Sequence, residues 1–325
     1  MGQAKVIVTG GAGFIGSQLV RALLKSGTHY DSILVIDSIE AFKQRPCTQS
    51  FRNQINCIES EDFLEKLTEF KPEVIFHMGA SSSTEEYRED FLKKVNIDYS
   101  KTLWDYCIQE KISFFYASSA ATYGDGSLGF DDDPEKFSQL KPLNPYGRSK
   151  LAFDLLVQKD IEKGKEPPRW AGFKFFNVYG PGEEHKGSQA SVLWSARKQI
   201  KDKGIIKLFK SHRPEYKDGE QLRDFVYVGD ITDCLISFYK KTAKNGIYNL
   251  GSGRARSFKD LAHAVAAAYK VPAQIEYIPM PEHLRPHYQY FTEAKMNRLL
   301  ASGAEFKKTT LEEGIRLSIE DIENA

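Results

Sequence analysis

The feature that most constrains this chain is a glycine-rich segment near its beginning, residues 8–16. It follows a short apolar run that we expect to form a buried strand, and it leads into residues 14–24, where apolar side chains recur at helical spacing. Gly10, Gly13 and Gly16 permit a tight turn, let backbone N–H groups approach a pyrophosphate and let the helix pack closely on the sheet. The segment therefore predicts a dinucleotide-binding turn, with the phosphates at the positive end of the helix.

The rest of the chain repeats the alternation of apolar runs and amphipathic segments. This predicts an α/β fold, a Rossmann-type doubly wound parallel sheet with a smaller C-terminal substrate-binding lobe. We expect strands at 5–8, 32–36, 74–77, 113–117, 171–176, 206–209, 223–228 and 247–250, and helices at 14–24, 61–70, 91–110, from 142–150 onward, 188–203 and 231–239. Residues 1–178 with a return segment at about 226–252 are expected to form the dinucleotide-binding domain, and 179–225 and 253–325 the substrate lobe.

Composition excludes several classes of protein. The 325 residues are 41% hydrophobic and 27% charged, which is ordinary for a globular protein, and the net charge of +1 gives no electrostatic case for a nucleic-acid or membrane partner. No apolar run is long enough to span a bilayer, and the first strand begins too early to leave room for a signal peptide. Cysteines at 47, 57, 107 and 234 lack metal-ligand spacing. We expect a cytoplasmic protein with reduced thiols.

An acidic residue, Asp37, follows the second expected strand about 20 residues after the glycines, where dinucleotide folds bind the adenosine ribose. Asp37 taken by itself favours NAD. Lys43 and Arg45 follow in the same expected loop and could neutralise a 2′-phosphate, so the residues leave NADP open as well.

Two further segments are candidates for sites. Small residues at 79–84 follow the strand at 74–77, and they would let a cofactor lie against the backbone, although a plain flexible loop also fits. The acidic run 131–135 is expected to be an exposed loop and not a metal site, because adjacent aspartates cannot all face one ion.

Tyr146 and Lys150 lie four residues apart on an expected helix, so both side chains project from one face. A phenol with a pKa of about 10 is a poor base at neutral pH, and a neighbouring ammonium together with a nicotinamide ring would favour the tyrosinate. Ser119, at the end of the strand before it, could hold a substrate hydroxyl. Such a set takes a proton from an alcohol while hydride leaves its carbon.

Several motifs, in their order along the chain, resemble those of a known superfamily of enzymes. TGGAGFIG, YASSAATYG, the Tyr146/Lys150 pair and RDFVYVGD at 223–230 stand in the order typical of extended short-chain dehydrogenase/reductases, which the chain resembles. Within that superfamily it is similar to the family of ADP-L-glycero-D-manno-heptose 6-epimerases over nearly its whole length. The segments that carry this narrower match are FHMGASSSTEEY (76–87), PLNPYG (142–147), FFNVYGPGEEHKGSQASV (175–192) and IEYIPMPEHLRPHYQYFTEA (275–294).

The resemblance implies an activity and a mechanism. Tightly held NADP takes a hydride from C6 of ADP-D-glycero-β-D-manno-heptose and returns it to the other face of a 6-keto intermediate, for lipopolysaccharide core biosynthesis. Because C6 lies outside the ring, rotation about one bond can present the opposite face. Lys186 is then the second acid/base group, across the carbonyl from Tyr146. The family also suggests a homopentamer.

The resemblance also implies which residues of this chain contact the cofactor and the substrate. The cofactor contacts implied are Phe14, Ile15, Asp37, Ser38, Lys43, Met78, Gly79, Ala80, Ser81, Ser82, Asn96, Lys150, Val178 and Lys186. The substrate contacts implied are Ser119, Asn177, Ser188, Phe209, Lys210, Ser211, His212, Arg223 and Tyr288. The chain departs from the family in three places: Ser195 stands where a histidine can occur, Gln44 stands where a lysine is expected, and the insert at 212–221 is long.

Rival functions share parts of this pattern. A UDP-hexose 4-epimerase would use the same fold, cofactor and Tyr146/Lys150 pair but has no need of Lys186. A 4,6-dehydratase would need acidic residues directly after the serines of the fifth strand, where Ala120 and Ala121 stand. A non-catalytic NADP-sensing protein is disfavoured because Ser119 and the Tyr146/Lys150 pair are intact. The sequence therefore predicts epimerisation at C6.

Overall fold

The computed structural model describes residues 5–324. Its main sheet has seven strands in the order β3-β2-β1-β4-β5-β6-β10, and every pairing in it is parallel. The strands are β1 (Val6–Thr9), β2 (Ile33–Ile36), β3 (Asn56–Ile58), β4 (Val74–His77), β5 (Ser113–Ser119), β6 (Trp170–Phe175) and β10 (Gly246–Leu250). The predicted doubly wound parallel sheet is confirmed, including the return strand at its edge.

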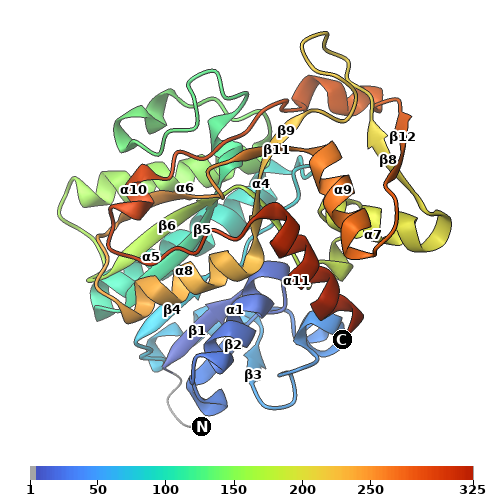
Figure 1. Ribbon diagram of the computed structural model, residues 1–325. Coiled ribbons are helices and arrows are strands. Elements are labelled where there is room, and N and C mark those ends of the chain that lie inside the picture. The colour runs from blue at the N-terminus through green and yellow to red at the C-terminus, as the bar shows by residue number, and fades with distance from the viewer. Residues whose placement is uncertain (1–4, 325) are drawn as a thin grey trace.

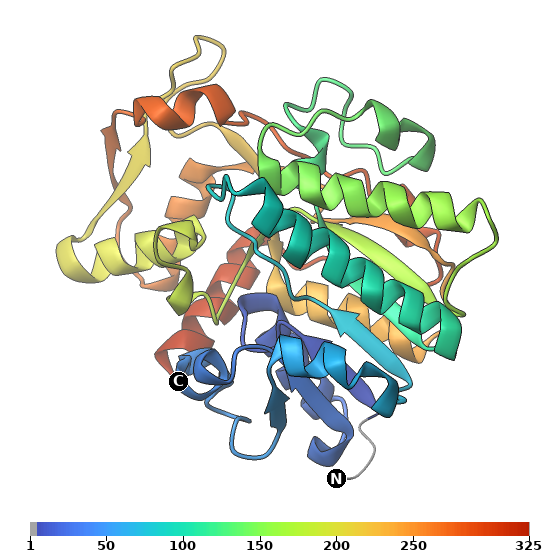
Figure 2. The same ribbon diagram turned by 180° about the vertical axis from the view of Figure 1, so that it is seen from behind.

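Helices cover both faces of this sheet. Helices α1 (Phe14–Lys25) and α8 (Val228–Lys240) lie on one face, and α5 (Tyr99–Glu110) and α6 (Pro145–Ile161) lie on the other (Figures 1 and 2). Strands β1, β2 and β4 are therefore buried at every position, which explains why their sequences are continuous apolar runs and not alternating ones. The carboxyl ends of β1 and β4 meet where the strand order reverses, and ligands of such sheets bind at that point.

Two helices near this edge have local features that the sequence explains or that mark the site. The α6 helix begins where predicted, because the Asn144 side chain accepts a hydrogen bond from the Gly147 N–H and Pro145 takes the first helical position. The helix expected at 91–110 is present but is built as α4 (Glu89–Leu92), a π-helical turn (Lys93–Asp98) and α5. The π turn lies at the position of Asn96, a buried residue at the site.

Other expectations about local structure were wrong. The expected loop after Asp37 contains the short helix α2 (Ile39–Gln44), which Ser38 caps by accepting from the Ala41 N–H. The helix expected at 61–70 ends early as α3 (Ser60–Glu65) and continues only as a 3-10 turn. The helix expected at 188–203 begins at Val192, because Gly187, with φ +55°, ends a preceding 3-10 segment (Glu184–Gln189).

The smaller part of the molecule has its own sheets and core. Strands β7 (Asn177–Tyr179), β9 (Leu222–Tyr227) and β11 (Ala255–Ser257) form one sheet, and β8 (Ile205–Phe209) pairs in parallel with β12 (Gln274–Ile278). Helices α7 (Val192–Lys203), α9 (Phe258–Ala268) and α11 (Leu311–Glu323) pack around a second apolar cluster, and α10 (Asn297–Leu300) lies near β10. In Figure 1, α7, α9, β8 and β12 lie to one side of the main sheet. The exact domain boundaries stay a prediction.

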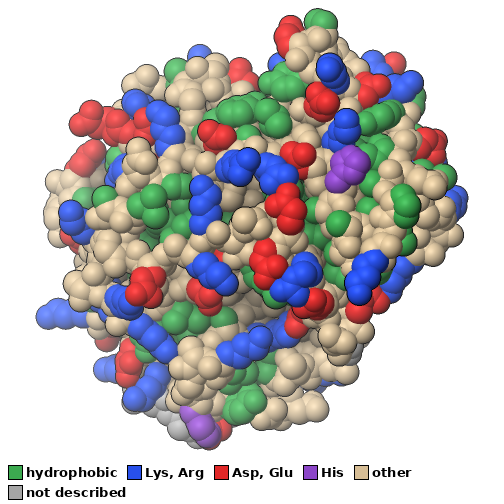
Figure 3. All heavy atoms as spheres, in the orientation of Figure 1, with side chains coloured by type: hydrophobic (Ala, Val, Ile, Leu, Met, Phe, Trp, Pro, Cys, Tyr) green, Lys and Arg blue, Asp and Glu red, His purple; other side chains and the backbone are tan. Residues whose placement is uncertain are grey.

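The surface charges are mixed in sign and the cysteines are unpaired, in keeping with the net charge of +1 and the scattered cysteine positions. On the face drawn in Figure 3, basic and acidic side chains are interspersed without a block of one sign. None of the helices between residues 5 and 324 is long and apolar enough to cross a membrane. All four cysteines are unpaired, and three of them are buried.

Candidate functional site

The glycine turn lies between β1 and α1 and has room only for glycine. Gly10 has φ +69°, and a Cβ there would lie 2.6 Å from the Gly79 Cα. A Cβ on Gly16 would lie 2.1 Å from the Gly10 carbonyl oxygen. Gly13 precedes α1 without a side-chain cap, and no acidic residue lies in the helix's first turn. Within the described residues the positive end of α1 thus lacks a side-chain acceptor, as a phosphate site requires.

The acidic residue after β2 is tied to this turn. One carboxylate oxygen of Asp37 accepts from the Ala12 N–H at 2.9 Å, and the other accepts from the Ser38 N–H at 2.8 Å. Burial is the largest influence on the Asp37 pKa and raises it. The basic residue that reaches the turn is Arg45, whose guanidinium donates to the Ala12 carbonyl at 3.0 Å. Lys43, the expected 2′-phosphate contact, is exposed on α2, so Arg45 is the better candidate.

The segment after β4 is held by buried polar side chains. His77 is 2% exposed and lies 2.7 Å from the Thr9 hydroxyl and 2.8 Å from that of Ser100. Asn96 accepts from the Ser81 N–H at 2.9 Å and donates to the Ser81 carbonyl at 3.1 Å. These bonds fix Met78, Gly79, Ala80 and Ser81 beside the glycine turn, where a cofactor would need them, while Ser82 is exposed.

Ser119, Tyr146 and Lys150 come together at the carboxyl end of β5. The Ser119 side chain lies close enough to the Tyr146 phenol to lower its pKa, and it accepts from the Ala121 N–H at 3.1 Å. The Lys150 ammonium donates to the Ala117 carbonyl at 2.8 Å. The predicted constellation of serine, tyrosine and lysine is thus present in space.

Burial dominates the titration of this group. It is the largest influence on the Tyr146 pKa and raises it, while Ser119 acts in the opposite direction. Burial also lowers the pKa of Lys150 to about 8, although the Asp154 carboxylate opposes this effect. The expected lowering of the tyrosine pKa depends on the nicotinamide ring as well as on Lys150, and it stays a prediction.

A buried ion pair lies next to the carboxyl ends of β5 and β6. Lys174 on β6 lies 2.6 Å from an Asp154 carboxylate oxygen on α6, and both side chains are fully buried. Asp154 also accepts from the Ser118 hydroxyl at 2.7 Å and the Tyr116 hydroxyl at 3.0 Å. Lys174 donates to Thr122 at 2.9 Å. The sequence analysis missed this pair, although the spacing of four from Lys150 to Asp154 could have indicated that carboxylate.

Lys186 lies against the glycine turn from the other side. Its ammonium lies 5.2 Å from the centre of the Phe14 ring, at the first residue of α1. It also lies 3.3 Å from a carboxylate oxygen of Glu183, a residue that is 0% exposed. Val178, on β7 of the same segment, is half-buried and packs against the main core. Glu183 was not singled out from the sequence, where it is one of two adjacent glutamates in a polar loop.

A pocket of about 510 Å³ lies near Ser119 and Tyr146. It is lined by Ala121, which follows Ser119 closely in the chain, and by Asn144, which precedes Tyr146. Asn177, Arg223 and Tyr288 line it as well. The Arg223 guanidinium lies 4.9 Å from the centre of the Tyr288 ring, and its hydrogen bond within the described residues goes to the Leu222 carbonyl next to it. Most of its donors are therefore left for an anionic ligand.

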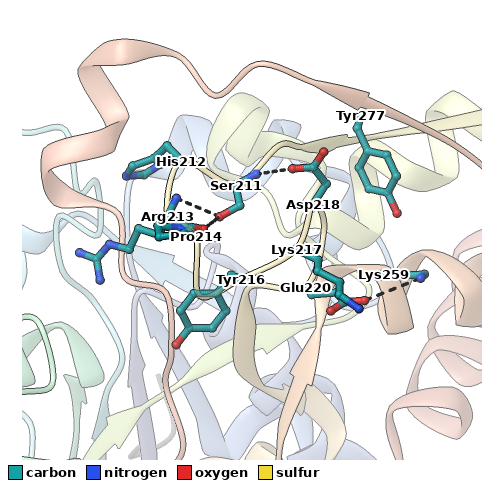
Figure 4. A pocket seen from close by; sticks show the side chains of 10 residues that line it. All are labelled: Ser211, His212, Arg213, Pro214, Tyr216, Lys217, Asp218, Glu220, Lys259 and Tyr277. Atoms are coloured by element: carbon teal, nitrogen blue, oxygen red, sulfur yellow. Dashed lines mark hydrogen bonds and ion pairs between the residues drawn. The ribbon is translucent and has the colours of Figure 1, made fainter.

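The long insert forms a second, more open hollow of about 740 Å³ (Figure 4). Ser211 and Asp218 close the loop through a 2.8 Å hydrogen bond, and Arg213 and Tyr216 point away from Tyr277. Among the expected nucleotide contacts, His212 bonds to the Tyr290 hydroxyl at 2.7 Å through its ring. Of the expected substrate contacts, Ser211 and His212 line this hollow, whereas Asn177, Arg223 and Tyr288 line the other pocket together with neighbours of Ser119 and Tyr146. The pocket next to Tyr146 is thus the better candidate for the reacting sugar.

Several other expected substrate contacts lie in the smaller part of the molecule, and most of them are exposed. Phe209 ends β8, and Lys210 follows it as an exposed residue. Ser188 is exposed in the 3-10 segment. Ser195, which stands in place of the family's histidine, is exposed on α7 and donates to the Val192 carbonyl of its own helix.

The acidic run near 131 has structural partners. Asp131 pairs with Lys136 and Lys295, and Asp133 caps a 3-10 helix. Asp132 is 1% exposed and accepts from the Asn249 N–H, so the expectation that the whole run is exposed was wrong. No group of three or more His, Cys, Asp or Glu side chains between residues 5 and 324 is arranged to hold a metal ion.

Comparison with known proteins gives a consistent result. Residues 6–251 match the model of the NAD dependent epimerase/dehydratase family. The chain is 43% identical over 323 residues to an ADP-L-glycero-D-manno-heptose-6-epimerase of Fusobacterium nucleatum, with 96% of each chain covered.

Solved structures agree. That of the ADP-L-glycero-D-manno-heptose-6-epimerase of Helicobacter pylori superimposes with a TM-score of 0.81 at 25% identity, covering 99% of this chain and 97% of that one. The UDP-glucose 4-epimerase of Thermus thermophilus, in complex with NAD, gives a TM-score of 0.75 at 26% identity, covering 98% of this chain and 99% of that one.

Proposed function

Because this chain belongs to the NAD-dependent epimerase/dehydratase family and, within it, to the ADP-L-glycero-D-manno-heptose-6-epimerases, we propose that it inverts C6 of its sugar through a 6-keto intermediate with bound NADP. The membership makes it an isomerase whose activity belongs to lipopolysaccharide core biosynthesis. The substrate is then ADP-D-glycero-β-D-manno-heptose and the product its L-glycero epimer.

The glycine turn supports the cofactor part of the proposal. Gly10 and Gly16 allow the close backbone contacts that build the tight turn, and the N-terminus of α1 after it has no side-chain cap. Asp37 and Arg45 stand where the adenosine ribose and a 2′-phosphate would lie. When bound, the nicotinamide supplies the chemistry of accepting a hydride from C6 and giving it back. NAD is the alternative, and the dinucleotide released on denaturation, identified by mass spectrometry, distinguishes the two.

On one side of the sugar, Tyr146 takes the proton of the C6 hydroxyl. Ser119 lies near the phenol and can hold the same hydroxyl. The buried Lys150 ammonium stabilises the tyrosinate when the positively charged ring is also present. The observation that carries the proposal is the convergence of Ser119, Tyr146 and Lys150 at the carboxyl end of β5.

On the other side, Lys186 gives a proton to the C6 oxygen as hydride returns. Its contact with Phe14, the first residue of α1 after the glycine turn, supports this role. Arg223 and Tyr288 in the adjoining pocket are suited to hold the diphosphate and the sugar side of the substrate.

The test is turnover of ADP-D-glycero-β-D-manno-heptose by the purified protein with NADP, followed by NMR of the C6 configuration. We expect inversion at C6, a loss of about 10²–10⁴-fold in Tyr146→Phe and a comparable loss in Lys186→Met, both with the dinucleotide retained. An unchanged C6 with inversion at C4 of a UDP-hexose would overturn the proposal. Full activity of Lys186→Met would remove the second acid/base group. A homo-oligomer and a cytoplasmic location remain predictions.

A further inference from the structure

Glu183 is a buried carboxylate in direct contact with the candidate acid Lys186. Its side chain is 0% exposed, whereas that of Lys186 is 25% exposed. The Lys186 ammonium lies 3.3 Å from one Glu183 oxygen. A buried carboxylate is costly unless it is paired and hydrogen-bonded, so its contacts call for a physical account.

All the polar contacts of Glu183 are with donors. One oxygen accepts from the Ser191 hydroxyl at 2.6 Å and from the Gly180 N–H at 3.3 Å. The other accepts from the Ser191 N–H at 2.8 Å and from Lys186. Burial raises the pKa of Glu183, and these donors and the ammonium oppose that rise. The carboxyl group is thus fixed in position by the loop after β7 and by the residue before α7.

We propose that Glu183 is the positioning residue that holds the Lys186 ammonium over Phe14, in place to give its proton to the C6 oxygen of the sugar. The inference rests on the proposed function, because it assumes that Lys186 is the second acid/base group. In the step itself, hydride returns to C6, an N–H bond of the ammonium breaks and an O–H bond to the C6 oxygen forms. Lys186 is left as a neutral amine, Tyr146 holds the proton that the substrate lost, and Glu183 neither gains nor loses a proton.

Other charged groups near Lys186 do not take the place of this carboxylate. His185 is adjacent in the chain, and burial lowers its pKa to about 4, with Arg45 and Lys186 acting in the same direction. From α1, the contact is the uncharged ring of Phe14. Arg45 therefore adds a like charge on this side. Glu184, the neighbouring glutamate, is exposed and makes no hydrogen bond or ion pair to Lys186 among the described contacts.

The proposal predicts that the loss on removing Glu183 appears in kcat. Without this carboxylate the Lys186 ammonium loses its partner at 3.3 Å and is no longer held in place, while the groups that bind the nucleotide sugar are unchanged. In Glu183→Gln, kcat should therefore fall about 10–100-fold, with a much smaller change in KM.

The experiment compares kcat and KM of the wild type, Glu183→Gln, Glu183→Asp and Glu184→Gln. Glu184→Gln is the matched control, because it removes the same type of side chain one residue away. We expect Glu184→Gln to follow the wild type, Glu183→Gln to show the lower kcat and Glu183→Asp to restore part of it. Retained dinucleotide and the melting temperature check that each variant is folded.

The outcomes separate this inference from the proposed function. If Lys186→Met is fully active, the proposed second acid fails and the inference fails with it. If Lys186→Met is inactive but Glu183→Gln keeps the wild-type kcat, only the inference is overturned. A higher KM with unchanged kcat in Glu183→Gln would show a purely structural role and would also overturn it.

Discussion

Lys174→Met tests how the buried ion pair beneath the catalytic group is stabilised. Lys174 and Asp154 are both fully buried, with 2.6 Å between the ammonium and the carboxylate oxygen. The ammonium also lies 4.3 Å from the centre of the Phe137 ring. Methionine fills a similar volume but carries no charge, so the variant leaves Asp154 buried without its counter-ion.

Removal of one partner of a buried pair typically costs about 3–5 kcal/mol, because the other charge stays desolvated. Asp154 keeps its bonds from the Ser118 and Tyr116 hydroxyls, which places the expected loss near the lower end, about 3 kcal/mol. Unfolding entropy is about 2 cal/mol/K per residue. For 325 residues, the expected loss corresponds to a melting temperature lower by about 4 °C.

The assay is thermal unfolding followed by circular dichroism. Lys136→Met is the control, because its pair with Asp131 lies at the surface, where solvent screens it, and should contribute far less to stability. In the double variant with Asp154→Asn, the loss should be smaller than the sum of the two single losses, since the pair is already broken in each. A melting temperature of Lys174→Met equal to that of the control variant would refute the reasoning.

Three further predictions follow from contacts in the site. Gly10→Ala should lose bound dinucleotide, measured in the purified protein by its absorbance, because the new Cβ meets the Gly79 Cα at 2.6 Å in a backbone with φ +69°. Burial lowers the pKa of His77 to about 3, so the protein holds this histidine in its neutral form. The free energy of unfolding should therefore be highest above pH 6.5 and should fall as the pH approaches 3. Denaturant unfolding should show a decrease of about 2 kcal/mol between pH 6.5 and 5, and a smaller decrease in His77→Gln. Arg223→Lys should raise the KM for the nucleotide sugar about tenfold or more with a smaller change in kcat, because one ammonium cannot replace a guanidinium stacked on Tyr288.

The parts of the fold that the sequence predicted well are those buried on both sides. Strand β4 was predicted at its observed bounds because all four of its residues are apolar or buried between two helical layers. The helix expected to open within residues 142–150 begins at Pro145, because proline suits the first helical position. The short helix α2 was missed, since six residues give too little periodicity to distinguish a helix from a loop.

The candidate site was predictable where spacing along one element decides it. Tyr146, Lys150 and Asp154 share one face of α6, and the same rule that gave the first two would have given the third. The contact of Arg45 with the glycine turn could not be predicted, because it depends on how α2 folds back towards Ala12. For the same reason the sequence favoured Lys43, which is nearer to Asp37 in the chain but is exposed.

The two candidate lysines differ in their immediate partners, and this difference fits their proposed roles. Lys150 donates to a neutral carbonyl, that of Ala117, and burial lowers its pKa to about 8. The Lys186 ammonium instead lies 3.3 Å from a carboxylate oxygen of Glu183. Tyr146 and Lys150 owe their common position to one helix, α6, so a spacing rule finds both of them. If Lys186 is the second acid, its position depends on Glu183, a side chain that no spacing rule indicates.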